Sequence, residues 1–150
     1  MSWSSGHDRG CQRHPAAFFP DEAQAQAQAV VRDHVAGRIE LKAPDLLPYE
    51  LANAVWQAER RSRISTAQAD EIIQALAGLQ IGIQSLDWAE MLPLARRFNR
   101  SAYDAAYLAL AEKLGEPLIT SNERLFNAVK AHLDWVQWLE SYANQGGGVR

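Results

Sequence analysis

The chain has 150 residues, of which 47% are hydrophobic and five are tryptophan, so one packed domain is expected rather than a disordered chain. A formal net charge of −3 gives no overall electrostatic case for nucleic-acid binding, although it leaves room for a local basic patch. The single cysteine, Cys11, excludes an intrachain disulfide, no apolar run reaches the roughly 20 residues of a membrane span, and the first residues lack a signal-peptide core. These features predict a cytoplasmic protein without membrane contact.

The first half of the chain begins without a regular pattern. Residues 1–15 are polar and aperiodic, so loop or disorder is expected there. From Pro20 an Ala- and Gln-rich run leads to Gly37, which predicts a helix that ends in a glycine C-cap. Residues 39–44 (IELKAP) predict a short strand stopped by proline, and a helix follows from about Leu47 to Arg61.

The second half alternates between helices and short strands. Helices are predicted over Thr66–Gly78, Trp88–Phe98, from Ser101 to the glycine at 115, and Glu123–His132; strands are predicted in GIQSL (82–86), PLITS (117–121) and DWVQWL (134–139). This alternation predicts an α/β fold, a three-layer α/β/α sandwich with a mostly parallel sheet. Because nothing before Phe18 is an apolar run, the first strand is expected to be degenerate or missing.

Three polar residues stand at comparable places, each in the first turn of a predicted helix or just before it. They are Glu50, Asp104 and Asn122. In an open α/β sheet, helix N-termini that follow successive strands gather at one edge, where ligands bind. Carboxylates brought together there repel one another unless a cation neutralises them, which points to Mg²⁺ or Mn²⁺. Such an ion polarises a phosphate and acidifies a bound water for attack on a phosphodiester.

Each of these residues also has a purely structural interpretation. Ser101-x-x-Asp104 is a capping-box pattern, in which the carboxylate satisfies a backbone N–H. Asn122 can equally be the N-cap of the helix that follows. Glu50, in a first helical turn, gains from the helix dipole without any ligand. Spacing alone therefore leaves both interpretations open.

Two longer stretches resemble PIN-domain ribonucleases of the VapC toxin type. APDLLPYELANAVWQAERRSRIS resembles the segment in which an acidic residue follows an aromatic one at a helix start. RSAYDAAYLALAEKLGEPLITSNERL resembles the second signature, a Ser/Thr-x-Tyr-Asp helix, a glycine turn, a strand and Thr-x-Asp/Asn. The resemblance implies that Glu50 and Asp104 are the second and third acids of the site, with Asn122 in place of the fourth. It also implies the metal, either Mg²⁺ or Mn²⁺.

The start of the chain departs from that pattern. Relatives open with an apolar strand ending in Asp, and Gly10 stands where this Asp belongs. Asp8 is the nearest acid and is the remaining candidate for the first metal ligand. A shifted reading frame or a truncated gene would explain the departure. We therefore expect residues 1–17 to be disordered or non-homologous, 18–142 to form the PIN-like domain, and 143–150 to be a flexible tail.

Other candidates carry less chemistry. His7 and His14 flank Cys11 in the aperiodic start and are expected to be unspecialised. Two arginine clusters could hold RNA phosphates, or simply be solvated helix ends: Arg60, Arg61 and Arg63, and Arg96, Arg97 and Arg100. Five aromatic residues are expected to be mostly core by position: Trp56, Tyr103, Tyr107, Trp135 and Trp138.

Three functions remain open at this stage. The resemblance implies a metal-dependent endoribonuclease toxin of a type II toxin–antitoxin pair, with RNA as substrate, a small antitoxin laid along hydrophobic helices, and a homodimeric state. A PIN remnant without catalysis, which only binds an antitoxin or RNA, is the second. An unrelated α/β domain whose capping residues mimic the pattern is the third.

Overall fold

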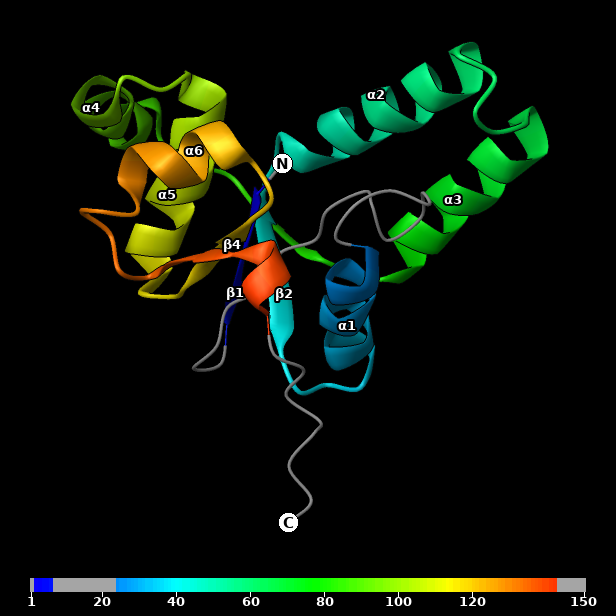
Figure 1. Cartoon of the computed structure of the whole chain (residues 1–150), viewed down its shortest axis with the longest axis horizontal. Coiled ribbons are helices and arrows are strands. Elements are labelled where there is room, and N and C mark those ends of the chain that lie inside the picture. Colours follow the sequence, from blue (N-terminus) through cyan, green and yellow to red (C-terminus); the bar gives the residue numbers. More distant parts are fainter. Residues whose placement is uncertain (1, 7–23, 143–150) are drawn as a thin grey trace.

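A five-stranded sheet forms the centre of the molecule, and helices cover both of its faces (Figure 1). The computed structural model describes residues 2–6 and 24–142. The strand order across the sheet is β3-β2-β1-β4-β5. The strands are β1 (Ser2–Gly6), β2 (Glu40–Pro44), β3 (Gly82–Gln84), β4 (Leu118–Thr120) and β5 (Val136–Trp138).

Four of the five strands run in the same direction. β3 is parallel to β2 and β5 is parallel to β4, while β1 is antiparallel to both β2 and β4. The register places Ser2 opposite Thr120 and Gly6 opposite Glu40. The expected mostly parallel sheet is thus confirmed, with β1 as the one reversed strand.

The prediction of loop or disorder was wrong for Ser2–Gly6, which form the central strand β1. The first strand was expected to be degenerate or missing, and it is present as a polar, reversed strand. The segment is polar and has no strand-like hydropathy pattern. It is nevertheless a strand, because β2 and β4 offer backbone partners along both of its sides. A hydropathy pattern does not reveal backbone pairing of this kind.

The helices lie close to their predicted bounds. α1 was expected to end at Gly37 and ends two residues earlier, and that glycine has the left-handed φ of +74°. α6 ends at Val129, three residues before the predicted His132. The helices are α1 (Gln24–Val35), α2 (Leu47–Arg60), α3 (Thr66–Gly78), α4 (Trp88–Phe98), α5 (Ala102–Leu114) and α6 (Glu123–Val129), followed by the 3₁₀ turn η2 (Leu139–Ser141).

Neighbouring residues of β4 belong to the two faces of the sheet. Leu118 packs in a cluster with α4, α5 and α6, whereas Ile119 packs with Val30 of α1 and Leu41 of β2. Successive side chains of a strand point to opposite faces, so this split is the signature of two helical layers around one sheet. The three-layer sandwich is confirmed.

Of the described helices, α5 has the largest share of buried residues. Every residue from 105 to 111 is buried, including both Leu108 and Leu110 at 0% exposure. Its sequence is apolar on all sides, as expected for a helix enclosed by other elements. Within the part of the chain that the structure describes, no helix combines the length and apolar character needed to cross a bilayer.

The burial of α5 makes a stability prediction. Leu108→Ala should lower the free energy of unfolding by about 2–5 kcal/mol, because it removes buried methyl groups and leaves a cavity. The control is Leu92→Ala on α4, where the side chain is 49% exposed and little should change. Urea unfolding followed by circular dichroism measures both, and equal effects would contradict the assigned core.

Candidate active site

The helix starts that carry the three predicted residues meet at one edge of the sheet. β2 and β4 run in the same direction, so their carboxyl ends lie at the same edge. Glu50 lies in the first turn of α2, which follows β2, and Asn122 is the N-cap of α6, which follows β4. Asp104 lies in the first turn of α5, which packs against β1 and β2.

The carboxylate of Asp104 is not used for helix capping. Ser101 Oγ accepts the backbone N–H of Asp104 at 3.1 Å, which is the first half of the capping box. Where the second half would be, Asp104 instead accepts hydrogen bonds from Arg100 Nε at 3.1 Å and Asn122 Nδ2 at 3.2 Å. Elsewhere in the chain the box is complete, at Ser65 with Gln68 and at Asp87 with Glu90. The structural interpretation therefore explains Ser101 but not the carboxylate.

Asn122 has both a structural and a site contact. Its Oδ1 accepts the backbone N–H of Leu125 at 3.1 Å, as an N-cap does. That contact fixes the amide so that Nδ2 faces Asp104. The backbone N–H of Asn122 donates to Thr120 Oγ1 at 3.0 Å, and Thr120 is buried. Asn122 thus presents a donor, not an oxygen ligand, to the neighbouring carboxylate.

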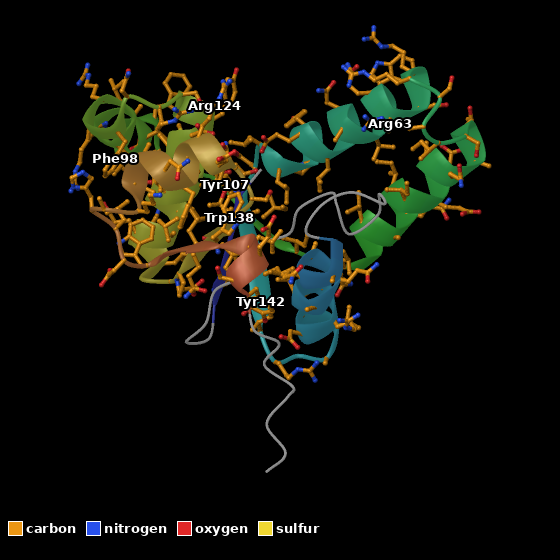
Figure 2. All side chains as sticks on the ribbon, in the orientation of Figure 1. Arg63, Phe98, Tyr107, Arg124, Trp138 and Tyr142 are labelled. Atoms are coloured by element: carbon orange, nitrogen blue, oxygen red, sulfur yellow. The ribbon has the colours of Figure 1, made fainter. Side chains whose placement is uncertain are left out.

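Glu50 is held by a residue whose role the sequence did not reveal. Tyr107 OH donates a short hydrogen bond to Glu50 Oε1. The sequence pattern assigns Tyr107 to the core, which is correct for its ring, since the residue is 2% exposed. Its hydroxyl nevertheless reaches Glu50, and Tyr107 lies three residues along α5 from Asp104. Tyr107 is labelled in Figure 2. The i, i+3 spacing of Asp104 and Tyr107 was the available signal.

The electrostatics link these groups. Burial raises the pKa of Glu50 above its ordinary value of 4.5, the hydrogen bond from Tyr107 lowers it, and the charge of Asp104 raises it again. Burial also raises the pKa of Tyr107, and the negative charges of Glu50 and Asp104 raise it further. Glu50 and Asp104 therefore lie close enough for each charge to act on the same surroundings.

The oxygen ligands at the candidate site are of the kind that a hard divalent cation prefers, but there are few of them. Glu50 and Asp104 supply carboxylate oxygens, which Mg²⁺ and Mn²⁺ prefer, and Ser121, beside Asn122, has a buried Oγ with no hydrogen-bond partner in the described part of the chain. Among the described residues there is no group of three or more Asp, Glu, His or Cys side chains that could hold a metal. Two carboxylates fit weak cation binding.

The remaining candidates divide by location. His7, Asp8, Cys11 and His14 lie outside the described residues. Of the five aromatic residues assigned to the core, two are exposed, Trp56 at 54% and Tyr103 at 71%, because helix position alone does not tell which face is covered. Trp135 and Trp138 are partly buried, and the Trp138 ring lies 5.4 Å from that of Phe126. Of the predicted arginine clusters, Arg100 is the member that contacts the site.

The chain is similar to proteins named as nucleases over most of its length. A family model described as the PIN domain matches residues 16–131. Ribonuclease VapC3 of Pyrobaculum aerophilum is 33% identical over 114 residues, which cover 73% of this chain and 84% of that protein. Ribonuclease VapC9 of Mycobacterium tuberculosis is 30% identical over 122 residues, covering 77% and 85%. Exonuclease VapC9 of P. aerophilum is 26% identical over 121 residues, covering 80% and 91%. The matched range of the family model includes Glu50, Asp104 and Asn122.

The raised pKa of Glu50 makes a prediction about stability and pH. A carboxyl whose pKa is raised on folding stabilises the fold while it is protonated and loses that contribution as pH rises through the folded pKa. Glu50→Gln removes the ionisation, so at neutral pH the variant should unfold at a higher temperature than the wild type. This gain should shrink below the ordinary value of 4.5. Glu112→Gln, an exposed position on α5, controls for the loss of one negative charge. A gain that does not depend on pH would contradict the assignment.

The hydrogen bond from Tyr107 makes a second prediction. Tyr107→Phe keeps the buried ring but leaves the carboxylate of Glu50 without its donor. The free energy of unfolding should fall by about 1.5–3 kcal/mol at neutral pH, as for other hydrogen bonds to charged groups. Tyr103→Phe is the matched control, because Tyr103 lies on the same helix and is 71% exposed. Chemical denaturation compares the two, and a change no larger for Tyr107→Phe than for Tyr103→Phe would show that the contact contributes nothing.

Proposed function

This chain belongs to the PIN-domain family, and we propose that it is a metal-dependent endoribonuclease of the VapC toxin type with Glu50, Asp104 and Asn122 at its site. One observation carries the proposal. The carboxylate of Asp104 is left out of the helix cap and faces the same sheet edge as Glu50. A pair of acids held together at a helix-start edge suits the binding of a cation and a phosphate.

Glu50 and Asp104 are the residues that would hold Mg²⁺ or Mn²⁺. When bound, such an ion supplies positive charge to a phosphodiester and makes an attacking water more acidic. The chain's own contribution is positional. Tyr107 holds Glu50, Ser101 fixes the start of α5 beneath Asp104, and Thr120 orients the backbone of Asn122.

Contacts with RNA would come from the exposed arginines. Arg60, Arg61 and Arg63 lie at the end of α2 away from Glu50, about 15 Å along the helix axis by the usual rise per residue. A strand of RNA that reached from the site along α2 would meet them with its phosphates. This placement supports RNA as the substrate in spite of the negative net charge.

The site is proposed to work weakly, or only to bind. Two carboxylates give a hard cation less negative charge than three or four, and Asn122 contributes none. The carboxyl end of β1 does not add a carboxylate to the site. This end is Gly6, which pairs with Glu40 at the opposite edge of the sheet from Asn122. A module that binds antitoxin or RNA without cutting is therefore the second candidate. It is favoured because the described residues contain no group of three or more Asp, Glu, His or Cys side chains that could hold a metal.

An antitoxin and a second copy of the chain are the proposed protein partners. α2 and α3 enclose an apolar cavity of about 360 Å³, lined by residues that include Leu51, Ile73, Leu76 and Ile83. Ile73 and Ile83 are 41% and 43% exposed, so the groove offers apolar surface to an amphipathic segment. The groove starts on the same helix as Glu50, which suits a protein inhibitor. Sedimentation equilibrium at several concentrations measures the proposed homodimer.

The proposed activity is tested at Asp104. Asp104→Asn keeps the shape of the side chain and its place in the first turn of α5, but removes its negative charge. Any Mn²⁺-dependent cleavage of a labelled single-stranded RNA should fall by about a hundredfold or more, since a ligand of the ion loses its charge. Stability should change by about 1 kcal/mol at most, because the lost ion pair with Arg100 is near the surface.

The controls separate cutting from binding. Glu112→Gln, on the same helix, should leave cleavage unchanged. Cleavage that persists in Asp104→Asn or in the presence of EDTA would refute the proposed metal-dependent site. RNA retention by the wild type without any Mn²⁺-dependent cleavage would identify the chain as a binding module instead.

A further inference from the structure

Both carboxylate oxygens of Asp104 are occupied by donors from the chain itself. Arg100 Nε donates to Oδ2 at 3.1 Å, and Asn122 Nδ2 donates to Oδ1 at 3.2 Å. A cation that used Asp104 as a ligand would meet an N–H group at each oxygen. The guanidinium of Arg100 is the stronger obstacle, because it also carries a positive charge.

The two donors differ in how firmly they are placed. Asn122 is fixed, since its Oδ1 caps α6 through Leu125 and its backbone N–H is held by Thr120. Arg100 is fixed only through its backbone. It stands in the short link between α4 and α5, where Asn99 has a left-handed φ of 50° and the Arg100 N–H donates to Ala95 O at 3.0 Å. The contact with Asp104 is the side-chain hydrogen bond that the structure gives for Arg100.

The Arg100 side chain can therefore leave without any movement of the backbone. It is 25% exposed, so rotation of its side-chain torsions carries the guanidinium into solvent. The ion pair is of the partly exposed i, i+4 kind, which contributes little stability. A contact that is weak and close to solvent can be exchanged for a bound ion.

We infer that Arg100 is an internal counter-ion of the site, which competes with a divalent cation for Asp104 and must swing away before the cation binds. The inference rests on the proposed cation site and names the residue that regulates its occupancy. In the cation-free state, Arg100 neutralises one of the two carboxylates. In the bound state, the divalent ion takes over that role.

Calorimetric titration with Mn²⁺ tests the competition. Arg100→Gln keeps a polar side chain of similar reach but removes the charge. Its Kd for Mn²⁺ should be about fivefold lower than that of the wild type, the ratio that corresponds to about 1 kcal/mol for a partly exposed ion pair. Arg96→Gln, at an exposed arginine of α4, carries the same change in net charge and should leave the Kd within a factor of about two.

Asn122→Asp serves as the positive control for the cation site. Asp caps a helix about as well as Asn, so the fold is kept while a third carboxylate joins the donor set. If Asn122→Asp tightens Mn²⁺ binding but Arg100→Gln binds as the wild type does, competition by Arg100 is refuted and the cation site stands. If none of the four proteins binds Mn²⁺, the cation site and the competition both fail.

The second measurement follows the side chain of Arg100 directly by nuclear magnetic resonance. In nitrogen-15-labelled protein, the Nε–H signal that is missing from Arg100→Gln identifies Arg100. Saturation with Mg²⁺, which is diamagnetic, should move that signal toward the position of a solvated arginine. A signal that stays at its cation-free position in the Mg²⁺-saturated protein would overturn the inference, even if the affinities follow the expected order.

Discussion

The repulsion between two carboxylates at one edge of the sheet is the constraint on which the polar contacts of the candidate site depend. β2 and β4 point the same way, so the helix starts that follow them share an edge, and α5 packs beside them. Glu50 and Asp104 are thereby brought into each other's electrostatic field. Tyr107 donates to one of them, and Arg100 and Asn122 donate to the other. These hydrogen bonds offset the repulsion between the two carboxylates that the fold brings together.

The reversed central strand shows why the site has this composition. In an all-parallel sheet every strand brings its carboxyl end to the same edge. β1 brings its amino end there instead, with Ser2 opposite Thr120. The edge that holds Glu50 and Asp104 is therefore supplied by the strand–helix connections of β2 and β4 and by the start of α5. Among the described residues, the two acids of the candidate site come from those segments.

The sequence predicts the helices well because their signals are local. Caps and glycine stops act within a turn, so α3 and α4 have the predicted bounds, and the polar residues at the starts of α2, α5 and α6 lie where expected. The strand Ser2–Gly6 could not be predicted, since its backbone partners lie 34 or more positions away in the sequence. The hydroxyl of Tyr107 and the donor face of Asn122 depend on the packing of α5 against α2 and α6, which no local pattern records.

Helix capping alone does not account for these residues. It explains Oδ1 of Asn122, which bonds Leu125, and the hydroxyl of Ser101, which bonds the backbone of Asp104. Two other helices of the same chain complete their boxes with a longer Gln or Glu side chain at the third position, whereas α5 has Asp104 there. The carboxylate of Asp104 is turned instead toward an arginine and an amide from a different helix start. The carboxylate of Asp104 thus lies outside the cap, beside a half-buried glutamate whose pKa is raised by burial. Its position is the observation behind the proposed cation site, so the choice between a cutting enzyme and a binding module depends on what occupies Asp104.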